Sequence, residues 1–323
     1  ASNIYGCVTS GPAVLTVNAS VLDPLSSGEP NGTVYATAIQ SDGRLVVGGT
    51  FTAVGAYARS RLARLLPNGK MDTQFNPNAN GDVYCILQQS DGKLLVGGAF
   101  TTIGNKTCRY LGRLFPNGTL DTNFNAAVTE RIYCLAWERD GQILAGGVNK
   151  LLRFTEAGVI DTTFHPTVSG TIYSIVDQPV MFTAGTGIIV GGSFLTIAGG
   201  GRQSLARLWP DGRLDTLFNT PVTGTVYALA LQPDGGVVLG GQFTKVGSYS
   251  RANVARLDLS GQVVENYNPG ATNTVYSIAT QADGKLVLGG QFTYLAGVSR
   301  TGLGRLNPDG SIGKESLAFL QNW

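Results

Sequence analysis

Residues 225–244 read T-V-Y-A-L-A-L-Q-P-D-G-G-V-V-L-G-G-Q-F-T, and this stretch decides the fold. Branched and aromatic residues lie on both sides of Asp234-Gly235, which is typical of two strands joined by a tight turn. The pattern returns along the chain, and each copy is marked by a tyrosine: Tyr35, Tyr84, Tyr133, Tyr173, Tyr227 and Tyr276. Repetition at a spacing of about 50 residues predicts an array of one supersecondary unit.

One repeat contains four strand-like segments. In the copy around Tyr227 the first three are residues 225–232, 236–243 and 254–259, with a loop of about ten residues (244–253) between the second and the third. Ser260-Gly261 then turns the chain into a fourth segment. Four antiparallel strands per repeat are typical of a propeller blade. The sequence therefore predicts an all-β, six-bladed β-propeller of four-stranded antiparallel blades.

The two ends of the repeat array complement each other. The last copy lacks the Leu-Asp-Thr-x-Phe-Asn motif that ends other copies, whereas Leu22-Asp23 stands 13 residues before Tyr35, as Leu214-Asp215 stands 13 before Tyr227. A propeller ring avoids an open edge when strands from both chain ends share one blade. We therefore expect residues 21–27 to close the ring as the fourth strand of the last blade, beside Leu303–Leu306.

Three regions follow from the repeat boundaries. Residues 20–312 form the propeller, and residues 313–323 form a C-terminal tail. Residues 1–19 read A-S-N-I-Y-G-C-V-T-S-G-P-A-V-L-T-V-N-A, which resembles the closing turn and last strand of a bacterial immunoglobulin-like domain. The alternative is an extra arm on the propeller.

Positions shared by all copies are interpreted as structural. The small residues after each tyrosine, Cys85 and Cys134 among them, are expected to face a bulky partner in the next blade, and the tyrosine is expected to be the bulky half of that junction. Gly-Gly at the end of the second strand predicts close backbone approach between blades. Arg64, Arg113, Arg153 and Arg207 each precede an aspartate by eight residues, which predicts repeated Arg–Asp bridges or turn caps.

Composition excludes several classes of function. The net charge is +2 and 14% of residues are charged, without a basic stripe, so nucleic-acid binding is not expected. No apolar run approaches about 20 residues, so membrane insertion is not expected either. The four cysteines show no CxxC spacing and the chain has one histidine, so we predict no metal and no cofactor.

The region from Thr33 to Asp309 resembles the delta-60 β-propeller repeat of large secreted bacterial proteins. The resemblance is carried by V-Y-A-L-A-L-Q-P-D-G (226–235), G-G-Q-F-T (240–244), A-R-L (255–257) and L-D-T-L-F-N (214–219). It implies an extracellular or cell-surface location and a module of a multidomain protein. The resemblance says little about activity, and we predict adhesion or another surface interaction, with a glycan or a surface protein as partner, from the variable long loops.

The second connection of each blade and the link to the next blade are predicted to share one face of the disc, here called the long-loop face. Loops vary between copies and commonly carry binding residues, and exposed tyrosine and arginine are frequent anchors. The third blade lacks the long loop, which predicts a notch in this face. The predicted ligand-binding residues are Tyr57, Arg59, Arg202, Tyr249, Arg251, Tyr294 and Arg300.

Two rival functions stay open. A carboxylate-based, glycan-active hydrolase in the axial channel would use the non-repeated acids Glu138 and Asp177, and a pair of inward carboxylates at the long-loop mouth would support it. His165 replaces an asparagine of other copies and is interpreted as a turn residue, so no catalytic residue is predicted. The second rival is a structural subunit of an extracellular assembly, joined through its terminal strands.

Overall fold

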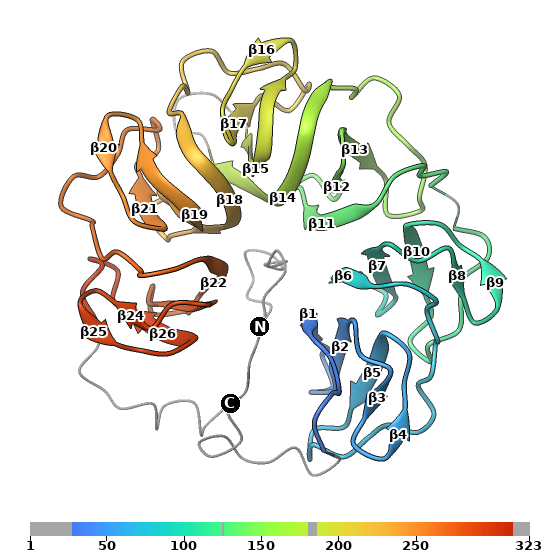
Figure 1. Cartoon of the computed structure of the whole chain (residues 1–323). Coiled ribbons are helices and arrows are strands. Elements are labelled where there is room, and N and C mark those ends of the chain that lie inside the picture. Colours follow the sequence, from blue (N-terminus) through green and yellow to red (C-terminus); the bar gives the residue numbers. More distant parts are fainter. Residues whose placement is uncertain (1–27, 125, 180–185, 313–323) are drawn as a thin grey trace.

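The computed structural model describes residues 28–124, 126–179 and 186–312. The strands form six main antiparallel sheets that stand side by side in an arc around one axis (Figure 1). The prediction of an all-β chain built from propeller blades is confirmed. No helix in the described part of the chain is long and apolar enough to cross a membrane.

Each main sheet contains a first, a second and a third strand in this order, two of the sheets have one further short strand, and we number these blades one to six along the chain. The first strands lie nearest the axis (Figure 1). They are β1 (Val34–Ile39), β6 (Val83–Gln88), β11 (Ile132–Trp137), β14 (Val168–Pro179), β18 (Val222–Leu231) and β22 (Val275–Thr280). The second strands are β2 (Leu45–Gly49), β7 (Leu94–Gly98), β12 (Ile143–Gly147), β15 (Thr186–Ile197), β19 (Val237–Val246) and β23 (Leu286–Gly290). The third strands are β5 (Leu62–Leu65), β10 (Leu111–Leu114), β13 (Lys150–Phe154), β17 (Leu205–Leu208), β21 (Val254–Leu257) and β26 (Leu303–Leu306).

Every first strand contains a β-bulge at its tyrosine. In blade one, Val34 pairs with Gly49 and Ala36 pairs with Gly48, so that Tyr35 has no opposite residue. The same register shift occurs at the tyrosine of the other five blades. A bulge bends the strand and redirects one side chain. Here it frees the tyrosine from the ladder on the innermost strand of each sheet.

Close contacts require glycine at both positions of each Gly-Gly pair. The second glycine faces the bulged strand of its own blade, and in blades one to five the first glycine faces the next blade. A Cβ on Gly241 would lie 2.1 Å from the carbonyl oxygen of Thr225 in the bulged strand. A Cβ on Gly240 would lie 2.8 Å from Cγ1 of Val275 in the next blade. A side chain at Gly241 would force the backbone to shift, and one at Gly240 would displace the buried side chains of Val275 and Ile278. The predicted close approach between blades is confirmed for the first glycine of the pair.

The bulky group of each junction is the valine or isoleucine before the tyrosine. Ile132 is fully buried against Gly97 of the preceding blade, close to Cys85. Cys85 and Cys134 are buried and unpaired, as predicted, and burial raises the pKa of both thiols. The tyrosine itself is only half-buried. Its interpretation as the bulky half of the junction is corrected, because the smaller β-branched neighbour fills that space.

The long loop between the second and third strands is a β-ribbon at the rim of the disc (Figure 1). The strands of the separate ribbons are β3 (Ala53–Val54) with β4 (Tyr57–Ala58), β8 (Thr102–Ile103) with β9 (Lys106–Thr107), and β24 (Tyr294–Leu295) with β25 (Val298–Ser299). In blades four and five the second strand itself runs on to pair with β16 (Gly200–Gly201) and β20 (Tyr249–Ser250). Blade three has no ribbon, because Gly147 and Lys150 pair across a tight turn.

Ribbons and interblade links share one face, as predicted. Pro30 in the link before blade one bridges to Val54 in its ribbon, and Ala79 and Ala271 make the equivalent bridges in blades two and six. Asn31 adds to this contact, since its side-chain oxygen accepts from the backbone nitrogens of Thr52 and Ala53. The glycines of the tight turns lie on the other face in the left-handed region, with Gly235 at φ 80°.

The prediction of a fourth strand in each blade is wrong for the described residues. The segment after the third strand makes one isolated bridge, such as Leu208 to Leu214 in blade four. Blade six has the same bridge, from Leu306 to Ile312. Residues 1–27 and 313–323, including Leu22, the residues 1–19 arm and the C-terminal tail, lie outside the described residues. The predicted closure of the ring by residues 21–27 beside Leu303–Leu306 therefore stays a prediction.

Candidate functional site

The bulged tyrosines converge near the axis and form what we call the tyrosine collar: Tyr35, Tyr84, Tyr133, Tyr173, Tyr227 and Tyr276. Successive rings contact one another from blade to blade, with centroids 4.7–5.4 Å apart. Tyr84 and Tyr133 are stacked, and the other pairs are tilted or edge-on. Such geometries are favourable for aromatic pairs. All six side chains stay half-exposed.

The pKa values of three collar tyrosines, Tyr35, Tyr84 and Tyr227, are raised, mainly by burial and further by neighbouring phenols. Burial is the main reason why the pKa of Tyr84 is raised to about 12, and the neighbouring Tyr133 adds to it. The pKa of Tyr35 is raised by burial, by Asp82, and by Tyr133 and Tyr276, which belong to blades three and six. Mutual electrostatic influence between phenols of non-adjacent blades requires that their oxygens approach one another. The collar is therefore a convergent set of polar groups.

The polar residues beside the collar are mostly uncharged. The position two residues before each tyrosine carries Thr33, Asp82, Arg131, Thr171, Thr225 and Thr274. Asp82 pairs with Arg61 at 3.0 Å. Arg131 is exposed, and its hydrogen bond to Tyr133 raises the pKa of the guanidinium. This end of the collar thus presents phenols, several threonines and the guanidinium of Arg131 on the long-loop face.

The predicted binding tyrosines lie apart from the collar, on ribbons at the rim. Tyr57 is in β4 of blade one, and Tyr294 is in β24 of blade six, where half of its surface is exposed. The hydroxyl of Tyr249 in β20 donates to the carboxylate of Glu265. Tyr294 lines a shallow hollow of about 430 Å³ between the ribbons of blades five and six, together with Ala252, Pro269, Gly270, Ala271, Thr272 and Gly297.

The predicted binding arginines make contacts within their own blades. Arg59 and Arg251 are buried, with 7% and 5% of their surface exposed. Nη2 of Arg251 donates to the carbonyl of Glu265 at 3.0 Å, and Nη1 donates to Ser250 at 2.9 Å. Arg59, Arg202 and Arg300 likewise donate to backbone carbonyls of their ribbons. These contacts fix the ribbon and leave little of Arg59 and Arg251 for a ligand.

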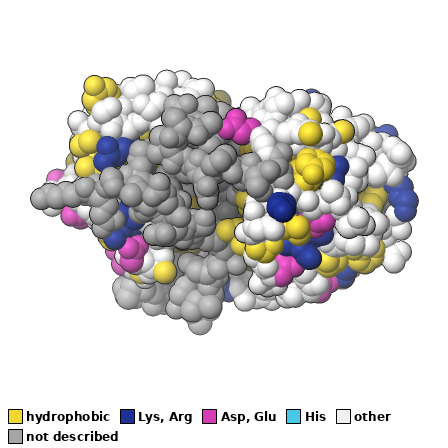
Figure 2. Space-filling model, turned by 90° about the horizontal axis from the view of Figure 1, so that it is seen from below, with side chains coloured by type: hydrophobic (Ala, Val, Ile, Leu, Met, Phe, Trp, Pro, Cys, Tyr) yellow, Lys and Arg dark blue, Asp and Glu magenta, His cyan; other side chains and the backbone are white. Residues whose placement is uncertain are grey.

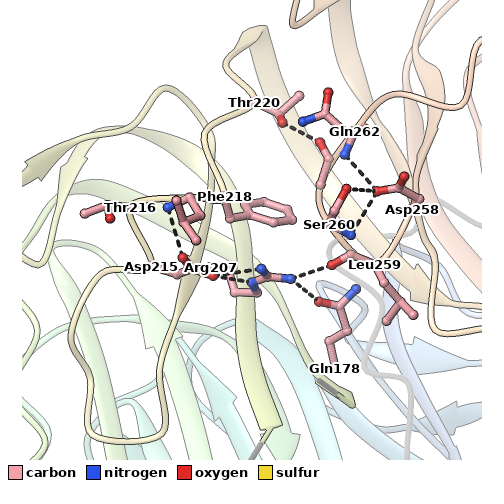
Figure 3. A network of polar contacts seen from close by, with 12 residues as sticks. Gln178, Arg207, Asp215, Thr216, Phe218, Thr220, Asp258, Leu259, Ser260 and Gln262 are labelled. Carbon is pink, nitrogen blue, oxygen red and sulfur yellow. Dashed lines mark hydrogen bonds and ion pairs between the residues drawn. The ribbon is translucent and has the colours of Figure 1, made fainter. Parts of the chain in front are cut away.

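The predicted Arg–Asp pairs are confirmed, and the aspartate also caps its turn. Nη2 of Arg207 lies 2.7 Å from Oδ2 of Asp215, while Oδ1 of Asp215 accepts from the backbone nitrogen of Leu217 (Figure 3). Phe218 covers the guanidinium, with its ring centroid 4.7 Å away. The equivalent pairs are Arg64–Asp72, Arg113–Asp121 and Arg153–Asp161. Their burial and repetition make them structural.

The two acids of the rival hydrolase lie near the tight turns, away from the collar mouth. Glu138 is buried and its Oε1 lies 3.7 Å from Nη1 of Arg153; burial raises the pKa of Glu138 to about 7. Oδ2 of Asp177 accepts from the backbone nitrogen of Arg139 at 2.9 Å. They are not the pair at the long-loop mouth that a glycosidase would use. His165 contacts the carbonyl of Thr163 in its own turn, as expected of a turn residue.

Sequence reasoning missed the collar as a site because it treated every repeated residue as structural. A usable signal was present: a large, partly polar aromatic directly before a small residue and opposite Gly-Gly, in every first strand. Glycine opposite a bulge is a known device for redirecting a side chain. Figure 2 shows acidic and basic side chains interspersed on the described part of the disc edge. No group of histidine, cysteine and acidic side chains suited to a metal occurs in the described ranges.

No curated protein sequence matches this chain. Among solved structures, the selenomethionine-substituted virginiamycin B lyase from Staphylococcus aureus is similar with a TM-score of 0.54 at 14% identity, over 87% of this chain and 83% of that chain. The Dos1 propeller is similar with a TM-score of 0.51 at 16% identity, over 90% of this chain and 73% of that chain. At such identities the likeness shows the fold alone.

The sequence profile of DUF5122, a β-propeller domain of unknown function, matches five stretches: residues 40–75, 89–124, 187–218, 232–263 and 281–312. They cover just over half of the chain and correspond to blades one, two, four, five and six. Blade three lies outside the matches. It is also the blade without a ribbon, and it has Glu138 at the position where the other repeats have glutamine. The chain belongs to the DUF5122 β-propeller family, in agreement with its resemblance to delta-60 repeats.

Proposed function

We propose that this chain is a non-catalytic binding module whose ligand lies over the tyrosine collar on the long-loop face. The observation that carries the proposal is the bulge at all six tyrosines, which brings six half-exposed phenols to one place near the axis. Packing alone does not call for tyrosine here, because valine or isoleucine already fills the junction. A hydroxyl at the same point of every blade favours recognition of a polar ligand.

The chemistry of the collar favours a neutral glycan. The phenols of Tyr84 and Tyr227 remain protonated at neutral pH, since the pKa of Tyr84 is raised to about 12 and that of Tyr227 is raised by burial and by Tyr173. They donate and accept hydrogen bonds, as do the threonines beside them. Asp82 is already paired with Arg61. A ligand rich in hydroxyl groups fits such a surface, and the exposed guanidinium of Arg131 can donate to the same hydroxyl groups. An extracellular or cell-surface location is part of this proposal.

The test is binding of neutral oligosaccharides on an array, followed by calorimetry with the strongest hit. Tyr84→Phe and Tyr227→Phe each remove one hydroxyl and keep the ring contacts, and each should weaken binding about tenfold, the size expected of one lost hydrogen bond. Tyr57→Phe on the rim is the matched control and should leave affinity unchanged. Unchanged affinity in the collar variants, with loss in Tyr294→Ala, would assign binding to the rim ribbons instead.

A further inference from the structure

A repeated glutamine, five residues after the collar tyrosine, joins neighbouring blades on the face of the tight turns. It is present as Gln40, Gln89, Gln178, Gln232 and Gln281. In blade four, Oε1 of Gln178 accepts from Nη1 of Arg207 at 3.0 Å, and Nε2 donates to the carbonyl of Gly235 in blade five at 2.8 Å. Gln89 of blade two likewise donates to the carbonyl of Glu156 in blade three at 3.0 Å. The donor half of the amide is therefore the half that reaches the next blade.

Blade three has Glu138 in the position of this glutamine. Its Oε1 lies 3.7 Å from Nη1 of Arg153, so the acceptor half of the contact is retained. Its Oε2 is buried and, within the described ranges, has no hydrogen-bond partner. A carboxylate cannot donate a hydrogen bond, whereas a protonated carboxyl group can donate as the amide does. The position therefore suits the neutral acid, and burial raises the pKa of Glu138 to about 7.

A second buried carboxylate approaches Glu138 from blade four. It belongs to Asp177 in β14, whose Oδ2 accepts from the backbone nitrogen of Arg139 at 2.9 Å. This bond ties blade four to the first turn of blade three. After burial, the influences on the pKa of Glu138 are Arg153, which lowers it, and then Asp140 and Asp177, which raise it. A negative charge on Glu138 would thus be opposed by a negative charge of the next blade.

The cations around Glu138 are already paired or exposed. Arg153 is shared, because its Nη2 lies 2.6 Å from Oδ2 of Asp161. Its Nη1 also donates to a turn of blade four, and the ionisable residues of that turn, Asp211 and Arg213, pair with each other in an exposed position. Ionised Glu138 would therefore compete for a guanidinium that a closer carboxylate holds.

We infer that the interface between blades three and four is pH-sensitive: it is closed while Glu138 carries a proton and separates more readily when Glu138 is ionised. Ionisation removes the donor that the other blades keep as an amide, and it adds a charge that repels Asp177 across the interface. The closed interface holds the proton with a pKa of about 7, against the ordinary carboxyl pKa of 4.5 in an open one. Separation therefore becomes more favourable as the pH rises between these values.

Two buried cysteines report on adjacent interfaces. Sγ of Cys134 lies 3.9 Å from the carbonyl oxygen of Ile172, inside the interface between blades three and four. Cys85 has the equivalent position between blades two and three, where a Cβ built on Gly97 would lie 2.5 Å from its sulfur and 2.9 Å from Cγ2 of Ile132. Both side chains are fully buried. Each thiol should therefore react only after its own interface separates or the whole protein unfolds.

The test compares the rates at which maleimide modifies Cys134 and Cys85 in the whole chain at pH 6 and pH 8, followed by peptide mass spectrometry. The ratio of the two rates cancels the pH dependence of thiol ionisation in the open states. It should rise about tenfold from pH 6 to pH 8. Glu138→Gln should abolish the rise, and Asp177→Asn should reduce it. Asp140→Asn is the exposed control and should keep it.

A ratio that stays constant with pH in the original chain would overturn the inference, and so would an equal rise in the Glu138→Gln protein. Global unfolding exposes both cysteines alike. Faster modification of both at pH 8 with a constant ratio would therefore mean that Glu138 acts on the stability of the whole ring and not on this interface, and it too would overturn the inference.

Discussion

Arg207 and Leu259 belong to neighbouring blades, and Nη1 of the arginine donates to the carbonyl of Leu259 at 2.6 Å (Figure 3). The same guanidinium pairs with Asp215 of its own blade at 2.7 Å. One side chain thus ties the last segment of a blade to a turn of the next. The equivalent interblade bonds run from Arg64 to Pro116, from Arg113 to Glu156 and from Arg153 to Pro210.

Asp215→Ala should lower the free energy of unfolding by about 3–5 kcal/mol, because it leaves the buried Arg207 without its carboxylate. Urea denaturation followed by circular dichroism measures the change. Asp211→Ala is the matched control, since its pair with Arg213 is largely exposed, and it should cost at most about 1 kcal/mol. Equal effects of the two substitutions would mean that the buried pair has no special role.

Gly241→Ala should destabilise the protein by about 3 kcal/mol or prevent folding, because its Cβ would lie 2.1 Å from the carbonyl oxygen of Thr225. Gly201→Ala is the control. No atom lies within 4 Å of a Cβ built on Gly201, and the expected change is within about 0.5 kcal/mol. Thermal unfolding of the two variants compares them directly. A stable Gly241→Ala protein would contradict the account of the bulge.

Glu138 should make stability depend on pH. Burial raises its pKa from 4.5 to about 7, against the opposing effect of Arg153 and with help from Asp140 and Asp177. The native state therefore keeps a proton that the unfolded state releases between pH 4.5 and 7. The free energy of unfolding should fall as pH rises through this window, by up to about 3 kcal/mol, and this contribution should stay lost above pH 7.

Glu138→Gln restores the residue found in the other repeats and should abolish that fall. Urea denaturation at pH 5 and pH 8 measures it. Asp140→Asn is the control, since Asp140 is exposed and the slope should persist without it. A Glu138→Gln protein whose stability falls with pH as steeply as the original would rule out Glu138 as the source.

Arg251→Ala should lower the free energy of unfolding rather than weaken ligand binding directly. Its guanidinium is buried and donates to the carbonyls of Ser250, Val264 and Glu265, so its loss should cost about 1.5–3 kcal/mol. Arg109 is exposed two residues after the ribbon of blade two, and Arg109→Ala should change stability by less than about 0.5 kcal/mol. Chemical denaturation of both separates the roles. If the Arg251→Ala protein were as stable as the original but bound the ligand more weakly, Arg251 would have a direct role in ligand binding.

Local contacts were predictable because the residues that make them lie within one repeat. The Asp-Gly turns, the buried cysteines after the tyrosines, and the Arg–Asp pairs eight residues apart all follow from neighbours along one chain segment. The fourth strand was not predictable in this way. Its residues have strand-like character. However, the backbone nitrogen of Leu217 donates to the side chain of Asp215, and Phe218 is buried against the guanidinium of Arg207. The segment therefore forms a capped turn instead of pairing as a strand.

From the sequence alone came the repeat, its tight turns and the small, glycine-containing side of each blade junction, because these depend on periodicity and on residue size. Only the tertiary structure decided what the six tyrosines do. Their convergence depends on a bulge in each first strand and on an axis that no single repeat contains.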